Sequence, residues 1–169
     1  MRPGALLPWL LGALLLAGCS GGQAPANAGQ PQDLESAAIE RGLVRDPQET
    51  ELAGVYARDT DRLCIVATGL DYRLGAHVDY GDGITCSASG TLSRVGGTLH
   101  VELGGSDACS FDARFDGERI RFPGALPDGC SAFCARRASF AGLEVTRMSD
   151  STAEAQAMRD TAGRRLCAD

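Results

Sequence analysis

Cysteines are the residues in this 169-residue chain whose type and spacing point most directly to chemistry. One of the seven, Cys19, lies at the end of an apolar N-terminal segment, apart from the others. The remaining six are Cys64, Cys86, Cys109, Cys130, Cys134 and Cys167. An even number of cysteines in an exported domain is typical of three disulfides, and fifteen pairings of six cysteines are possible. We expect the pairs Cys86–Cys109, Cys130–Cys134 and Cys64–Cys167.

Metal and redox chemistry are the alternatives for these cysteines. Zinc sites typically use a CxxC or a cysteine–histidine spacing, and the sequence contains neither. Cys130 and Cys134 are separated by three residues, whereas redox pairs usually have a CxxC spacing at a helix N-terminus. The spacing therefore favours a structural disulfide, and we expect no metal ligand and no cofactor.

The two histidines, His77 and His100, are the other candidates for catalysis. Both fall on the polar side of predicted strands, so we expect them to face solvent, and their spacing suggests no catalytic partner. The chain has no GxSxG, HExxH, P-loop or GxGxxG motif. Two carboxylates in the glycine-rich segment 79–83 favour a hairpin turn over a calcium site. The sequence thus predicts no catalytic residue and a protein that is not an enzyme.

The N-terminus has the features of an export signal. One positive residue, Arg2, precedes an apolar run over residues 5–17. This run is shorter than the roughly 20 apolar residues that a membrane-spanning helix needs. We therefore expect residues 1–18 to be a signal peptide, removed from the mature protein.

The residues that end this segment, Leu16-Ala17-Gly18-Cys19, resemble the lipobox of bacterial lipoproteins. The resemblance implies cleavage between Gly18 and Cys19, acylation of the Cys19 thiol by fatty chains such as palmitate, and usually acylation of the new amine. Cys19 would then hold the protein at a membrane. Ser20 follows it, and by analogy with enteric bacteria a residue other than aspartate here favours the outer membrane. The alternative is an ordinary secretory peptide with a chance cysteine.

Composition limits the partners of the mature chain. Its formal charge is about −7, because removal of Arg2 with the signal changes the net charge of −6 by one unit. This acidity argues against nucleic acid and against electrostatic docking on anionic lipids. Residues 19–33 are rich in Gly, Pro, Ala, Gln and Asn, which indicates a flexible tether behind the lipidated N-terminus. Residues 34–169 are long enough for one domain.

Helical patterns occur at both ends of that domain. Residues 34–44 have the apolar spacing of a short helix, and Asp46-Pro47 favours the start of another that ends near Leu52. A C-terminal helix is predicted from Asp150 to Leu166, with a cap at Asp150 or Ser151. The residues expected to face the rest of the domain are Ala155, Met158 and Thr161 or Ala162, with Cys167 pinning the helix.

Between these helices the apolar period changes to two. Tyr72, Leu74, Ala76, Val78 and Tyr80 alternate with polar residues, and later segments repeat the pattern between glycine-containing turns such as Asp116-Gly117. Together with 54–58, 63–68 and 139–147, they predict about eight strands in an antiparallel meander. We expect a small, mainly β, antiparallel barrel, with a sandwich as second choice. Residues 123–138 are expected to form an irregular loop.

The segment Glu51-Leu52-Ala53-Gly54-Val55-Tyr56 resembles the first-strand entry of lipocalin-like barrels, where Gly-x-Tyr packs the aromatic ring under the barrel floor. It is also similar to the small barrels of exported inhibitors, such as lysozyme-inhibitor lipoproteins and the metalloprotease inhibitors of Gram-negative bacteria. The resemblance implies a barrel that binds a ligand or a protein.

Three functions follow from these patterns. The first is a non-enzymatic, outer-membrane-tethered periplasmic module that binds or inhibits an envelope protein or assists in the envelope. The second is a carrier of a small apolar ligand. Its cavity would be lined by Tyr72, Tyr80, Phe111, Phe115 and Phe122. The third is an enzyme whose residues come from distant positions.

Overall fold

A computed structural model describes residues 34–43 and 49–167. The expected signal peptide, the Gly18–Cys19 cleavage site and the tether lie outside these ranges. No helix within them is long and apolar enough to cross a membrane.

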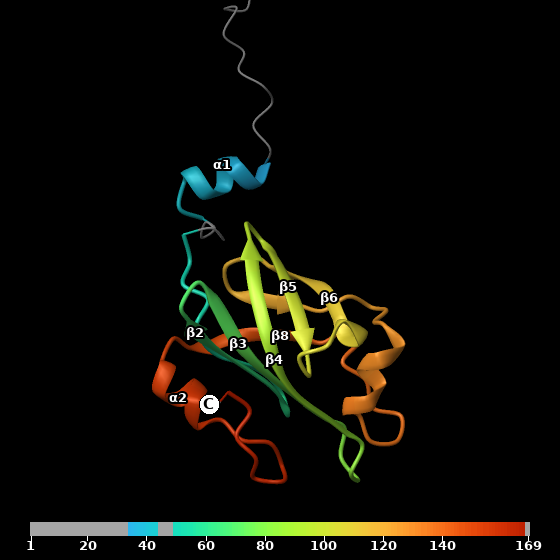
Figure 1. Ribbon diagram of the computed structural model, residues 1–169. Helices are drawn as coiled ribbons and strands as arrows, with labels where there is room; N and C mark the ends of the chain where they lie inside the picture. Colours follow the sequence, from blue (N-terminus) through green and yellow to red (C-terminus); the bar gives the residue numbers. More distant parts are fainter. Residues whose placement is uncertain (1–33, 44–48, 168–169) are drawn as a thin grey trace, which may run out of the picture. The chain divides into compact units, whose positions relative to one another are not determined.

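Eight antiparallel strands form a closed barrel, in which each strand pairs with its neighbours in sequence and the last pairs with the first (Figure 1). In chain order they are β1 (Gly54–Arg58), β2 (Asp61–Thr68), β3 (Asp71–Asp79), β4 (Thr85–Val95), β5 (Thr98–Leu103), β6 (Ser110–Phe115), β7 (Arg119–Arg121) and β8 (Glu144–Ser149). The prediction of a mainly β, eight-stranded barrel is confirmed. Closure gives every strand two partners and leaves no open sheet edge.

Apolar side chains occupy every second position of a strand, and the face that carries them is the inner one. In β3, Leu74, Ala76 and Val78 belong to the barrel interior, while Gly75 and His77 point to the outer face. Tyr80, predicted to continue the inner row, follows the end of β3 and is 60% exposed. The apolar period therefore identified the inner face correctly as far as the strand extends.

The two ends of the barrel carry different turns and connections. We call the end at which β1 begins the entry end. It carries the β2–β3, β4–β5 and β6–β7 turns, because successive strands run in opposite directions. The opposite end, called the far end, carries the β1–β2, β3–β4 and β5–β6 turns and the long β7–β8 connection. Two 3₁₀ helices lie there, η1 (Asp107–Cys109) and η2 (Asp128–Phe133).

Buried side chains from all eight strands fill the interior. Tyr56 of β1 packs edge-on against Phe115 of β6, with ring centroids 6.4 Å apart. Phe111 and Phe122 form a second edge-on pair at 4.8 Å. Large rings that meet in this way fill the space inside the barrel.

The helices of the structure differ from those predicted. Helix α1 spans only Leu34–Glu40, and the expected helix start at 46–47 lies outside the described residues, while residues 49–53 are not helical. Helix α2 covers Thr152–Ala157 in place of 150–166, although Ser151 caps it as expected by accepting a hydrogen bond from the Glu154 N–H. The last strand begins at Glu144, because residues 139–143 belong to the preceding loop.

The C-terminal helix ends early because the chain turns back on itself. The Asp160 carboxylate accepts hydrogen bonds from the backbone N–H groups of Ala162 and Arg164, and Gly163 has a positive φ of 79°. These local bonds replace those that a continuing helix would make. As a result Arg159 pairs with Arg165 in a short antiparallel bridge.

We call residues 155–167 the C-terminal strap. It packs on the outer face of the barrel, where Ala155, Leu166 and Cys167 form a small apolar cluster with residues of β2. Leu166 lies directly over Gly75, and the Ser89 hydroxyl donates a hydrogen bond to the Leu166 carbonyl. The predicted contact of Ala155 with the barrel is confirmed. Thr161 and Ala162 are exposed instead, because the helix has ended before them.

Candidate functional site

The six cysteines form three disulfides, but only one of the expected pairings is correct. Cys64 is bonded to Cys167, as predicted. The other pairs are Cys86–Cys134 and Cys109–Cys130, in place of Cys86–Cys109 and Cys130–Cys134. Helix η2 causes the difference, because it sets Cys130 beside η1 and carries Cys134 on to β4. Proximity in sequence therefore gave the wrong partners for four cysteines.

These two disulfides hold the β7–β8 connection, residues 122–143, which we call the stapled loop. Its ends are joined by a hydrogen bond from the Phe122 N–H to the Leu143 carbonyl. Its middle is joined to β4 by a bond from the Ala135 N–H to the Thr85 carbonyl. Phe140 is buried with the barrel core. A 22-residue connection without strands is thus fixed at both ends, at two disulfides and by its own core side chains.

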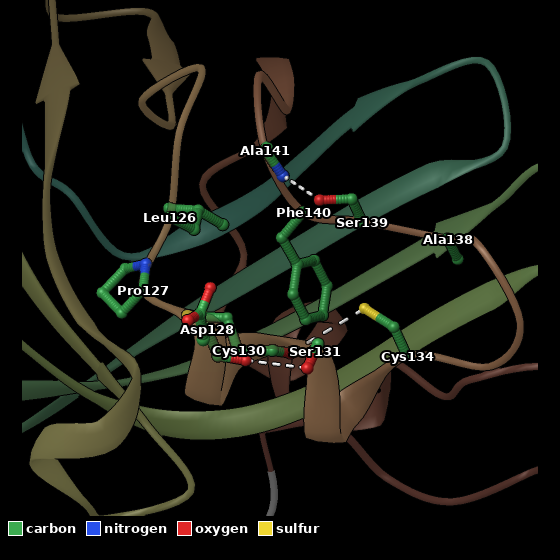
Figure 2. Close-up of a pocket in the computed structure, with 10 residues that line it drawn as sticks. All are labelled: Leu126, Pro127, Asp128, Cys130, Ser131, Cys134, Ala138, Ser139, Phe140 and Ala141. Atoms are coloured by element: carbon green, nitrogen blue, oxygen red, sulfur yellow. Dashed lines mark hydrogen bonds between the residues drawn. The ribbon is translucent and has the colours of Figure 1, made fainter.

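A cavity of about 300 Å³ lies within the stapled loop (Figure 2). It is lined by Leu126, Pro127, Asp128, Cys130, Ser131, Cys134, Ala138, Ser139, Phe140 and Ala141. The Phe140 ring points between the two sides of the loop in Figure 2. Ser139 accepts a hydrogen bond from the Ala141 N–H, and the Ser131 hydroxyl donates one to the Asp128 carbonyl. Polar and apolar groups therefore share the wall, and Asp128 is among the polar residues.

Two adjacent arginines, Arg136 and Arg137, are exposed on the same loop. Arg136 has a φ of 60°, in the left-handed region that residues other than glycine rarely adopt. This conformation costs about 1–2 kcal/mol, and the disulfide at Cys134 and the buried Ala138 fix the chain on either side of it. Non-glycine residues held in such conformations occur preferentially at binding sites.

A second group of polar side chains lies on the outer face of β5 and β6. His100 Nδ1 is 2.8 Å from Asp112 Oδ1, and His100 Nε2 is 3.1 Å from the Ser110 hydroxyl oxygen. Glu102 Oε1 lies 3.7 Å from the same Nε2. His100 is exposed, as predicted, and it has polar partners on the neighbouring strand that its spacing in the sequence did not suggest. Strand register could have revealed the group, since His100 lies opposite Asp112 and Glu102 opposite Ser110.

The order Ser110–His100–Asp112 is that of an acyl-transfer relay. Its surroundings do not favour that reaction, because the His100 side chain is 50% exposed and Glu102 would repel the negative charge of an attacked carbonyl. The hydrogen bond to Asp112 raises the pKa of His100 above its usual 6.5. We interpret the group as a hydrogen-bonded surface cluster in which the Asp112 carboxylate favours the protonated form of His100.

His77 is not solvent-facing, contrary to the sequence prediction. It is 3% exposed, its Nδ1 lies 2.7 Å from the Ser87 hydroxyl, and its Nε2 has no hydrogen-bond partner among the described residues. The strap packs beside it on the outer face of β3, over Gly75. A local alternation pattern cannot show this burial, because the covering segment lies some 80 residues further along the chain.

Two arginines close the entry end of the barrel from inside. Arg94 of β4 donates hydrogen bonds to the Thr50 and Gly96 carbonyls, and its guanidinium lies 5.4 Å from the Phe115 ring centroid. Arg147 of β8 lies 4.8 Å from the centroid of Tyr56. Burial raises the pKa of the Tyr56 hydroxyl far above its usual value, and this hydroxyl donates a hydrogen bond to the Leu52 carbonyl. This end is thus a packed structural floor.

No protein-family model, curated protein or solved structure matches this chain. Its candidate site is therefore defined by geometry alone. In the described ranges, 34–43 and 49–167, no three His, Cys, Asp or Glu side chains are arranged to hold a metal ion.

Proposed function

We propose that this chain is a non-enzymatic lipoprotein, tethered through Cys19 to the outer membrane, whose barrel binds or inhibits an envelope protein in the periplasm. The lipobox-like segment Leu16-Ala17-Gly18-Cys19 supports the anchor. The pairing of the other six cysteines is consistent with an oxidising compartment, in which such disulfides persist.

The stapled loop is the observation that carries the binding role. It presents a formed cavity at the far end, opposite the end at which the chain from Cys19 joins β1. A loop already held by Cys86–Cys134 and Cys109–Cys130 loses little conformational entropy when a partner binds. The mixed polar and apolar wall of the cavity can accept a side chain of a protein partner, and Arg136 and Arg137, exposed between the lining residues Cys134 and Ala138, offer charged contacts.

The filled interior favours this surface role over the carrier alternative. Of the five aromatic residues that a carrier would use, Phe111, Phe115 and Phe122 are buried in the core cluster. Tyr72 is only partly buried against that cluster, and Tyr80 is exposed outside it. Three of the five side chains that would line a ligand cavity are therefore part of the core themselves.

Site-specific photocrosslinking tests the binding role. A benzophenone amino acid is placed at Ser139, which lines the cavity, and at Glu154 on the exposed side of α2 as control. We expect one defined adduct with an envelope protein from Ser139 and none from Glu154. The additional substitution Ala141→Trp fills the cavity and should abolish the adduct. Equal labelling from both positions, or an adduct that survives Ala141→Trp, would contradict the proposal.

The anchor is tested by the intact mass of the non-reduced protein extracted from membranes. The expected mass begins at Cys19, includes two or three acyl chains and lacks six thiol hydrogens. Retention of Met1 would exclude the lipid anchor, and six free thiols would exclude the oxidised periplasmic domain.

A further inference from the structure

A second cavity, of about 180 Å³, lies on the outer face of the barrel between the C-terminal strap and helix η2. Strand β4 contributes Ser87 and Ser89, helix η2 contributes Phe133, and the strap contributes residues that include Arg164 and Arg165. In Figure 1 the red strap lies at the lower left of the barrel and the orange segment around η2 at its lower right. The cavity shares no lining residue with the one in the stapled loop. It is smaller than the roughly 300–1,000 Å³ of sites for drug-sized ligands, so it suits a small chemical group.

The buried ring of His77 determines what the Ser87 hydroxyl can offer to this cavity. His77 is 3% exposed, its Nδ1 lies 2.7 Å from the hydroxyl oxygen, and its Nε2 has no hydrogen-bond partner among the described residues. If the hydroxyl donated to Nδ1, the hydrogen on Nε2 would be buried without an acceptor. If Nδ1–H donates to the hydroxyl, only a lone pair on Nε2 stays unpaired, and buried acceptors without a partner are less rare than buried N–H groups without one. This second arrangement leaves the hydrogen of the Ser87 hydroxyl free to point into the cavity.

The two arginines at the cavity differ in their partners. The Arg164 guanidinium lies 2.9 Å and 2.8 Å from one carboxylate oxygen of Asp160, through Nε and Nη2, so this pair carries no net charge. Arg165 is exposed, and its guanidinium makes no ion pair or hydrogen bond within the described ranges. One uncompensated positive charge beside one free hydroxyl donor matches a monoanion. A carboxylate fits the planar fork of a guanidinium, whereas the second charge of a phosphate would face the Asp160 carboxylate without a partner.

We propose that this cavity binds a carboxylate with a small apolar substituent, and that Arg165 and Ser87 hold the carboxylate while the Phe133 ring contacts the apolar part. Phe133 is only partly buried against the core, so its ring also borders the cavity. The same chemistry occurs in a small organic acid and in the C-terminal residue of a polypeptide.

The Ser87–His77 pair suits binding and not hydrolysis. A proton that passed from the Ser87 hydroxyl to His77 would create a buried cation, and no carboxylate of the described residues bonds its Nε2 to stabilise that charge. The site goes beyond the proposed function, because it depends neither on the lipid anchor nor on the stapled-loop cavity.

NMR titration of the oxidised, full-length protein with benzoate tests the site. We expect saturable shifts of the Ser87 amide and the Arg165 Nε signals, with a dissociation constant of about 1–10 mM, as for other small fragments. Benzyl alcohol, which lacks the charge, and inorganic phosphate, which lacks the apolar part, should bind about tenfold more weakly or less. A short peptide that ends in phenylalanine, compared with its C-terminal amide, separates the two sources of the carboxylate. Tighter binding of the free peptide acid than of benzoate assigns the site to a chain end, and the reverse order assigns it to a small acid.

Two variants and one spectrum complete the test. Arg165→Gln should weaken benzoate binding about tenfold or more, because a charged hydrogen bond is lost. Arg121→Gln is the matched control, since it removes the same charge from β7, outside the cavity, and should leave the binding unchanged. Two-bond ¹⁵N–¹H spectra should show the Nδ1–H form of His77.

Three results would overturn the proposal. The first is the absence of saturable benzoate shifts in the unaltered protein. The second is equal binding by Arg165→Gln and Arg121→Gln, or equal binding of benzoate and benzyl alcohol. The third is the Nε2–H form of His77, because the Ser87 hydroxyl would then donate to the ring and not to a ligand.

Discussion

The guanidinium of Arg147 lies 4.8 Å from the centroid of the Tyr56 ring, so the last strand of the barrel is locked onto the first. Arg147 also donates hydrogen bonds to the carbonyls of Glu51 and Ala53, in the segment that precedes β1. One side chain therefore joins β8, the aromatic ring of β1 and the chain that crosses the entry end. We therefore infer that this contact helps to close the barrel, together with the pairing of β1 with β8.

We predict that Arg147→Ala lowers the free energy of unfolding by about 2–3 kcal/mol, because it removes a desolvated cation–π contact and two hydrogen bonds. The matched control is Arg121→Ala, whose side chain is 48% exposed and pairs with Glu144 on the surface. That change should cost less than about 1 kcal/mol. Urea unfolding of the oxidised proteins measures both values. Similar losses for the two variants would show that Arg147 does not close the barrel.

A methyl group at position 75 should displace the C-terminal strap. A Cβ there would lie 2.5 Å from Leu166 Cβ and 2.6 Å from the Leu166 carbonyl oxygen. We expect Gly75→Ala to destabilise the protein by about 1–3 kcal/mol. It should also speed amide hydrogen exchange at Leu166, whose N–H bonds the Met158 carbonyl. Gly124→Ala is the control, since nothing lies within 4 Å of its added Cβ. An unchanged exchange rate in Gly75→Ala would place the strap elsewhere.

The disulfides Cys64–Cys167 and Cys109–Cys130 should differ in how much they stabilise the folded protein. Cys64 and Cys167 are 103 residues apart, whereas Cys109 and Cys130 are 21 apart. Chain-entropy arguments assign about 4.7 kcal/mol to the longer loop and about 3.3 kcal/mol to the shorter. We therefore expect Cys64→Ser/Cys167→Ser to lose more stability in urea than Cys109→Ser/Cys130→Ser. The reverse order would show that native packing around the stapled loop outweighs loop closure.

The pKa of His100 should depend on Asp112. The hydrogen bond from this carboxylate raises the pKa of His100 above 6.5, so Asp112→Asn should lower it. NMR titration of the two histidine rings measures this shift directly. Asp116→Asn is the control, because Asp116 pairs with Arg119 in the next turn. A His100 pKa that is the same in both variants would exclude the interaction.

The same raised pKa fixes the sign of a pH effect on stability. The folded protein holds the His100 proton more tightly than the unfolded chain does. The resulting stabilisation is fully present below pH 6.5, the ordinary value for the unfolded chain, and is lost as the pH rises through the folded pKa. His100→Gln should therefore reduce stability at pH 5–6 more than at pH 8–9.

Some features of the site could be predicted from sequence and others could not. The register of β5 with β6 could have been worked out from the turn that joins them, but the approach of His100 to Asp112 was not predicted. The burial of His77 could not be anticipated, because the strap that packs beside it comes from the C-terminus. The cavity of the stapled loop depends on a cysteine pairing that spacing alone left open among fifteen choices.

The amino-acid sequence by itself determined the strands and their antiparallel order, because the two-residue apolar period and the glycine turns are local signals that each strand carries. It favoured a closed barrel over a sandwich, and the structure decided between the two through the pairing of β1 with β8. It also indicated that the six later cysteines would pair. Only the tertiary structure decided which cysteines meet, where the C-terminal helix stops and which histidine is covered. Those outcomes depend on contacts between segments distant in sequence, such as Leu166 over Gly75, and no local pattern encodes such contacts.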